Sequence, residues 1–209
     1  MPTTAEQKSE GWLSVTEVLD AFIPKGLLAW YLKTGAKEAK RLSTVALKIG
    51  SRVDELICQD VKEGKYKLST KDPIEVKNCM EAWESFKKDY QPVVKECQFE
   101  VSEQVSKVVG HVDLLTDNTL IDVKCASSIK ANYWIQVSAY YSMLPQDKFN
   151  QMGTPAILRL DKNLATYQFM TLRQAGLNLT ECINVFEGLL NAFRYYNPKK
   201  EIDIQNHIV

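Results

Sequence analysis

Apolar residues recur with helical spacing in several long stretches of the chain. This periodicity predicts a long helix over residues 36–63, ended by Gly64, and further helices over 131–144 and 172–196. A helix is also predicted to begin near Asp72-Pro73, where Pro73 suits a first-turn position. Ser14 and Glu17 have the spacing of a capping box, which predicts a short helix near the N-terminus.

The middle of the chain has a different pattern, in which valine-rich runs alternate with short polar steps. It predicts five strands, near residues 93–101, 105–115, 119–124, 155–160 and 165–171. Along the whole chain, the predicted order is helices, three strands, a helix, two strands and a final helix. This order predicts an α/β protein with a central mixed sheet flanked by helices. We expect one domain over 1–209, with a helical part at 1–91 and the sheet with its helices at 92–209.

Composition supports a globular protein, with 45% hydrophobic and 25% charged residues. No apolar run is long enough for a membrane span and the N-terminus lacks a signal-peptide core, so the cytoplasm, or a host cytoplasm for a phage-encoded chain, is expected. The five cysteines are scattered without a CxxC pair, which disfavours a zinc ribbon or a local Fe–S cluster. We expect them to be reduced and mostly buried.

Net charge is zero, which does not favour a broad duplex-binding face. The local balance differs, because the stretch from Lys33 to Arg52 holds six cations and one acid. Arg41, Lys48 and Arg52 are therefore candidates for contact with nucleic acid. A solvated helix face is the equally weighted alternative.

The most informative segment is a hairpin with a turn at Asp117-Asn118. A turn centred there pairs residues whose numbers sum to 235, which places Asp113 opposite Asp122. Directly opposed residues have Cβ atoms about 5 Å apart, and period two puts Lys124 and His111 on the same face.

Two facing carboxylates repel each other unless they take up a proton or a cation. Such an oxygen-rich site suits one or two Mg²⁺ or Mn²⁺ ions, with the carbonyl of Val123 as a further candidate ligand. Lys124 is suited to offset charge, position water or stabilise a developing phosphorane. A solvent-facing hairpin with two ordinary acids is the alternative.

Helix periodicity places Asp54 on the apolar stripe of the long helix and Glu55 on its polar face. Asp54 is thus a candidate third metal ligand, with Glu55 in reserve, and Gly50 is expected to permit close approach of another backbone. A boundary aspartate paired with a lysine is the alternative reading. In the helix after the hairpin, Gln136 and Tyr140 share a face, where they are candidates for contact with a phosphate or a base.

These segments together resemble the PD-(D/E)XK nuclease superfamily. More narrowly, they resemble its exonuclease branch, which includes bacteriophage lambda exonuclease and the nuclease domains of RecBCD-type helicase–nucleases. The matching segments are Gly50-Ser-Arg-Val-Asp54, Gly110-His-Val-Asp113, Asp122-Val-Lys124 and Gln136-Val-Ser-Ala-Tyr140.

The resemblance implies a restriction-endonuclease-like core and a metal-dependent deoxyribonuclease. It makes Asp113 and Asp122 metal ligands, Lys124 the catalytic lysine and Asp54 the helix-borne acid, where His or Glu is commoner. Some relatives hold an Fe–S cluster through cysteines near the C-terminus; only Cys182 lies there, so we expect none. DNA ends or single strands are the implied partner, with a separate helicase or single-strand-annealing protein as a further candidate and an oligomer left open.

Two other function classes compete with a nuclease. One is a non-catalytic module that holds DNA or a protein partner on a nuclease fold, and the other is an enzyme acting on a small nucleotide phosphate. The intact acid and lysine set disfavours the first, and the lack of a glycine-rich phosphate loop disfavours the second. Exonucleolytic or endonucleolytic cutting, polarity, preference for DNA or RNA, and the phage or cellular setting stay open.

Overall fold

The computed structural model describes residues 7, 8 and 10–198. A six-stranded mixed sheet lies at its centre, with strand order β1-β3-β4-β5-β6 and with β2 also paired to β3. β2, β3 and β4 are antiparallel, β4 and β5 are parallel, and β5 and β6 are antiparallel. The strands are β1 (Leu13–Ser14), β2 (Val94–Glu103), β3 (Val108–Thr116), β4 (Leu120–Cys125), β5 (Ala156–Leu160) and β6 (Tyr167–Thr171).

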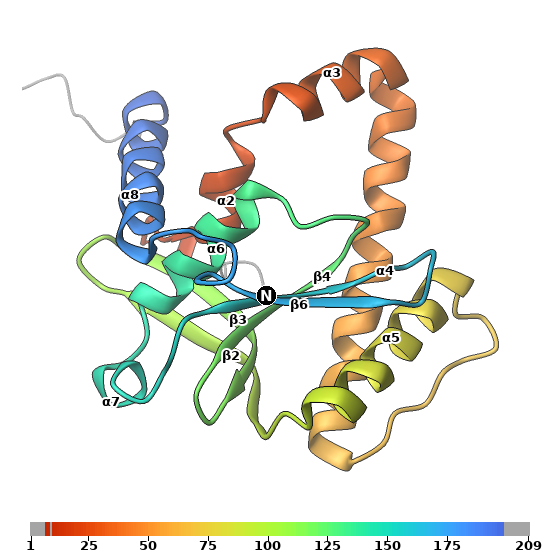
Figure 1. Ribbon diagram of the computed structural model, residues 1–209. Helices are drawn as coiled ribbons and strands as arrows, with labels where there is room; N and C mark the ends of the chain where they lie inside the picture. The colour runs from red at the N-terminus through yellow and green to blue at the C-terminus, as the bar shows by residue number, and fades with distance from the viewer. Residues whose placement is uncertain (1–6, 9, 199–209) are drawn as a thin grey trace, which may run out of the picture.

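Helices cover both faces of this sheet (Figure 1). They are α2 (Val15–Asp20), α3 (Lys25–Thr34), α4 (Ala36–Glu63), α5 (Ile74–Tyr90), α6 (Ala131–Ser142), α7 (Gln146–Phe149) and α8 (Leu179–Tyr196). α4 and α5 pack on one face around Trp83 and Phe86, while α2, α6 and α8 pack on the other around Trp134 and Phe186. The predicted fold class, a mixed sheet between helices, is confirmed.

The register of the β3–β4 hairpin follows from its apolar residues. Leu114 pairs with Ile121, and Leu115 with Leu120, so the paired numbers sum to 235 as predicted. Leu114 and Ile121 contribute to the core under α4 and α5, whereas Leu115 and Leu120 contribute to the core under α6 and α8. A slip of one residue would move each pair to the other core, so burial on both faces fixes the register.

Several predicted boundaries agree with the structure. The long helix spans 36–63 as expected and ends at Gly64 with φ 69°, a left-handed conformation that glycine adopts readily. Ser14 caps α2 by accepting a hydrogen bond from the Glu17 amide. None of the helices in the described residues is both long and apolar enough to cross a membrane.

Other boundaries were wrong. The C-terminal helix begins at Leu179, seven residues later than predicted, because Thr171 and Gln174 bond each other in a turn and Asn178 provides the cap. Pro73 lies at the N-cap of α5 rather than in its first turn. The elements β1, α3 and α7 were not predicted. β1 and α7 are too short for periodicity to reveal, and α3 buries none of its residues, so no core-facing stripe marks it.

A disulfide joins α4 to β2. Cys58 and Cys97 are bonded, with their Cα atoms 5.7 Å apart, while Cys79, Cys125 and Cys182 are free. The expectation that all five cysteines are reduced was therefore wrong. The sequence gives no hint of this pair, because the two residues are 39 positions apart and lie on different elements.

The cross-link should stabilise the fold by restricting the unfolded chain, by about 3–4 kcal/mol for a loop of this length. We expect a reductant to lower the melting temperature of the wild type but not that of the Cys58→Ala/Cys97→Ala double variant. Thermal unfolding with and without dithiothreitol measures both. An equal drop in the double variant would show that the reductant acts elsewhere.

Candidate active site at the β3–β4 hairpin

The two hairpin acids lie where β3 and β4 stop pairing. The ladder runs through Leu114 and Ile121, and the next opposed positions are Asp113 and Asp122. There the Asp113 carboxylate takes the place of a backbone acceptor, because its Oδ2 accepts the Val123 N–H at 2.7 Å. The strands thus separate around an acid that satisfies the freed amide.

Buried Asp122 and partly exposed Lys124 form an ion pair on β4. Lys124 Nζ lies 3.0 Å from Asp122 Oδ1, to which it donates, and 2.8 Å from Oδ2. The angles at Oδ2 are not those of a hydrogen bond, so this buried oxygen has a neighbouring charge but no donor. The Lys124 ammonium also lies 5.3 Å from the centre of the Tyr133 ring, an arrangement that favours its charged form.

The long helix brings a third acid to the hairpin. α4 packs against β4 in one core, and burial together with the charge of Asp113 raises the pKa of Asp54 to about 8. Glu55, by contrast, is exposed and forms an ion pair with Arg52. The structure therefore turns Asp54, and not Glu55, toward the hairpin. Gly50 was expected to allow another backbone to approach, but a Cβ at this position would meet nothing within 4 Å.

Burial sets the protonation of the two β4 side chains. It raises the pKa of Asp122 to about 7, although the charge of Lys124 opposes the shift. For Lys124, burial acts against protonation, but the charges of Asp122 and Asp113 outweigh it and raise its pKa above the ordinary range. Lys124 is thus a cation at neutral pH. One cation faces three acids, so the ionised site has excess negative charge.

This donor set fits a hard divalent cation in its chemistry. Its donors are carboxylate oxygens, and buried Asp122 Oδ2 has no hydrogen-bond donor. Among the residues that the structure describes, however, no three His, Cys, Asp or Glu side chains stand close enough together to hold a metal ion as placed. Asp113 and Asp122 are therefore the candidate direct ligands, and Asp54 is suited to act through bound water. The Val123 carbonyl stays a predicted ligand.

Gln136 and Tyr140 of α6 bond each other. Gln136 Nε2 donates to the Tyr140 hydroxyl at 2.7 Å, and both side chains are buried. The Tyr140 ring lies against Gly110 of β3, and burial together with the charge of Asp122 raises the pKa of its hydroxyl. The Tyr140 ring, predicted to contact nucleic acid, is 4% exposed and packed in the core, so its contact with a ligand stays a prediction.

The three predicted nucleic-acid contacts from α4 are placed differently from one another. Arg52 donates to Asp72 and to the Lys67 carbonyl, so it holds the loop before α5 against α4. Its contact with nucleic acid stays a prediction. Arg41 is exposed and paired with Glu38, and Lys48 is exposed.

Three residues near the site were not singled out by sequence reasoning. Gln98 of β2 donates to Asp113 Oδ1 at 3.0 Å. Tyr133 lies against Lys124. At the end of α2, burial raises the pKa of Asp20, while the positive charge of Lys124 lowers it in part. Tyr133 had a sequence signal, its place about one turn before Gln136 on the same helix, whereas Gln98 meets Asp113 through tertiary packing alone.

No known family model matches the chain, and no curated protein matches it. The chain is similar to a solved structure from Eubacterium rectale, named as a candidate exonuclease. Sequence identity is 15%, the TM-score is 0.56, and the match covers 100% of this chain and 95% of that one.

Two further matches are structures of the alkaline exonuclease LHK-Exo from Laribacter hongkongensis. One has 14% identity, a TM-score of 0.41 and coverage of 93% of this chain and 96% of that one. The other, in complex with dAMP, has 13% identity, a TM-score of 0.32 and coverage of 93% and 98%. At such identities, the likeness to the Eubacterium rectale structure establishes the fold alone.

Asp54 should make the metal-free protein less stable at higher pH. Its folded pKa of about 8 lies above its ordinary value of 3.8. The unfolded chain therefore releases this proton first, and the stability that depends on it is present at low pH and lost as pH rises through the folded pKa.

We expect the melting temperature in EDTA to fall between about pH 5 and about pH 8, and to fall less in Asp54→Asn. Thermal unfolding across this range measures it. Equal slopes in the two proteins would contradict the placement of Asp54. Glu55→Gln, one residue away on the exposed face, is the matched control and should keep the wild-type slope.

Close packing of β3 against α6 gives another test. A Cβ added at Gly110 would lie 2.4 Å from Cε1 of Tyr140, a ring that has little room to move. We expect Gly110→Ala to destabilise the fold by about 1–3 kcal/mol through overpacking. Denaturant unfolding measures this, and Gly188→Ala, on α8 with open space around it, is the control that should not destabilise.

Proposed function

We propose that this chain is a metal-dependent DNA nuclease, with exonucleolytic cutting as the favoured mode. The observation that carries the proposal is the set of buried Asp122 with half-buried Asp113 and Lys124 where β3 and β4 separate, under the helix that carries Asp54. The fold is shared with a structure named as a candidate exonuclease, which supports the same function class. The resemblance of the sequence motifs to PD-(D/E)XK nucleases supports it independently.

Asp113 and Asp122 would hold one or two Mg²⁺ or Mn²⁺ ions, which supply an activated water and Lewis acidity at the phosphate. Lys124 stays protonated, so it is suited to stabilise negative charge on the phosphate and not to act as a general base. Gln136 and Tyr140 form a buried bonded pair beside these residues. Their proposed role is to form one side of the site, and Gln136 is also suited to donate a hydrogen bond to a phosphate.

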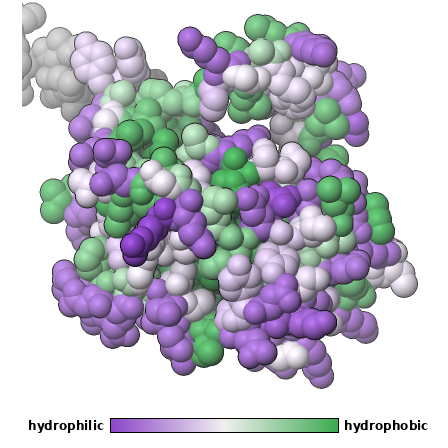
Figure 2. Space-filling model, viewed as in Figure 1, coloured by the Kyte–Doolittle hydropathy of each residue, from purple (hydrophilic) through white to green (hydrophobic). Residues whose placement is uncertain are grey.

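A basic arm provides a surface for DNA. We call α3 and the first part of α4, residues 25–48, the arm; Figure 1 shows it projecting from the body. It holds six cations and one acid. Figure 2 shows the surface hollowed between the arm and α8. α4 continues from the arm to Asp54, so a strand bound along the arm would be led toward the candidate site.

The decisive experiment is digestion of labelled linear, circular and single-stranded DNA with and without Mg²⁺. We expect Mg²⁺-dependent degradation of linear DNA. Retention of DNA without cutting would support a binding module instead. Hydrolysis of free nucleotides without cutting of DNA would favour the small-phosphate enzyme.

Two substitutions separate the roles of the acids and the lysine. Asp122→Asn should lose both Mn²⁺ binding and cleavage. Lys124→Met should lose cleavage, by about 100-fold or more, yet bind Mn²⁺ as well as the wild type, because its ammonium no longer competes for Asp122. Calorimetric Mn²⁺ titration and a cleavage assay measure the two effects.

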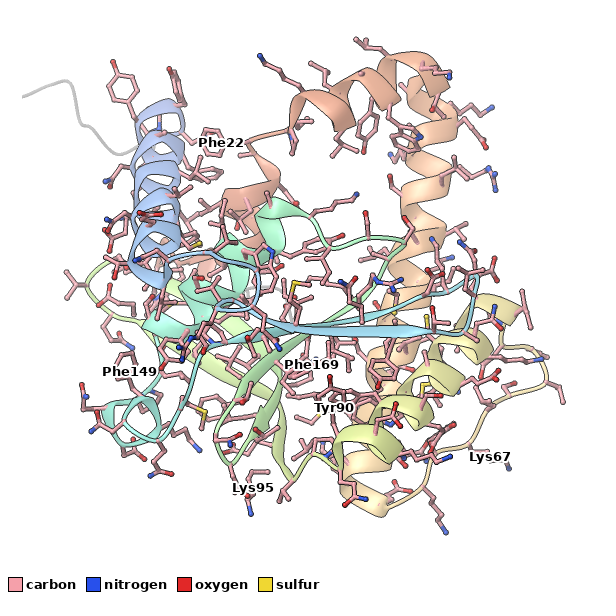
Figure 3. All side chains as sticks on the ribbon, viewed as in Figure 1. Phe22, Lys67, Tyr90, Lys95, Phe149 and Phe169 are labelled. Atoms are coloured by element: carbon pink, nitrogen blue, oxygen red, sulfur yellow. A yellow bond between two sulfur atoms is a disulfide. The ribbon has the colours of Figure 1, made fainter. Side chains whose placement is uncertain are left out.

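Asp117→Asn is the matched control, since it lies in the same hairpin but at its turn. Asp117 there pairs with Lys95, which Figure 3 shows at the end of the sheet away from the arm. It should behave as the wild type in both assays. If Lys124→Met still cut DNA at the full rate, the lysine would have no part in the reaction.

A further inference from the structure

Gln98 has an unusual backbone conformation. Its φ is 56°, in the left-handed region, which costs a residue with a side chain about 1–2 kcal/mol. The other described non-glycine residues with positive φ, which are Gln91, Lys107 and Ala165, lie at a helix end or in turns. Gln98 alone among them lies within a strand, so the surrounding structure must hold it there.

The neighbours of Gln98 are fixed on both sides. Cys97 pairs with Leu114 and is bonded to Cys58 of α4, one helical turn after Asp54. Phe99 pairs with Val112 and packs against the core under α6 and α8. Residues 97 and 99 are thus both held in register, and the conformational irregularity is confined to the single residue between them.

The result of this conformation is a defined contact with the candidate site. Gln98 Nε2 donates to Asp113 Oδ1 at 3.0 Å, while the Val123 amide donates to Oδ2 at 2.7 Å. Both donors are neutral, so they orient the carboxylate without cancelling its charge. Asp122 is held differently, by the charged amine of Lys124.

We infer that Gln98 is a positioning residue that orients the Asp113 carboxylate for a divalent cation. Side chains that orient a metal ligand commonly contribute about 10–100-fold to metal affinity. The inference rests on the proposed function, because it needs Asp113 to be a metal ligand. It predicts that the left-handed conformation of Gln98 serves the hydrogen bond from its amide to Asp113 and does not stabilise the fold.

Two substitutions test this. Gln98→Gly removes the amide and accepts the left-handed conformation without strain. The metal-free protein should therefore melt at the wild-type temperature or higher, while Mn²⁺ binding weakens by about 10-fold or more. Gln98→Met keeps the bulk of the side chain without its donor, and should weaken Mn²⁺ binding in the same way.

Gln91→Gly is the matched control. Gln91 also has a left-handed conformation, with φ 45°, but it caps α5 and has no contact with Asp113 among the described residues. The same change there should relieve the same backbone strain and leave Mn²⁺ affinity as in the wild type. Calorimetric titration with Mn²⁺ alone and thermal unfolding in EDTA give the two readouts.

The outcomes separate this inference from the proposed function. If the wild type binds Mn²⁺ and cuts DNA but both Gln98 variants bind Mn²⁺ equally well, the positioning role is overturned and the nuclease proposal stands. If Gln98→Gly binds weakly only because it melts below the wild type while Gln98→Met binds normally, the residue is structural. If the wild type neither binds Mn²⁺ nor cuts DNA, both proposals fail together.

Discussion

The hydrogen bond from the Val123 amide to Asp113 Oδ2 is the contact on which the site depends. It lets β3 and β4 separate without leaving a buried amide unpaired, which would cost about 1–3 kcal/mol. Where the strands separate, Asp113 and Asp122 come together with Lys124 instead of continuing a regular ladder. The hairpin therefore ends in a charged centre next to the apolar pairs Leu114–Ile121 and Leu115–Leu120.

Such a centre needs cover on both faces of the sheet. α4 and α5 enclose one side and α6 the other, and this burial is the main cause of the raised pKa values of Asp54 and Asp122. The same enclosure increases the attraction of the acids for Lys124 and for a dication. Packing that stabilises the fold thus also makes the acids favour a proton or a metal over free ionisation.

The disulfide and the left-handed Gln98 belong to one local arrangement. Cys97 and Gln98 are adjacent on β2; one is bonded to the helix that carries Asp54, and the other to the hairpin acid Asp113. The edge of the sheet therefore contacts both parts of the candidate site. At the opposite edge of the sheet, aromatic packing of Tyr90 and Phe169, with ring centres 4.9 Å apart, joins α5 to β6 (Figure 3).

The sequence by itself determined the hairpin register, the long helix and the side of that helix that bears Asp54. Each follows from a local rule: the turn at Asp117-Asn118, the period of apolar residues, and the two-sided burial that makes a register slip costly. Only the tertiary structure decided the Cys58–Cys97 bond, the pairing of Arg52 with Asp72, the burial of the Tyr140 ring and the contact of Gln98 with Asp113. These contacts join residues that lie on different elements and meet only when the helices and strands pack together. The periodicity of the sequence does not determine which of their side chains meet.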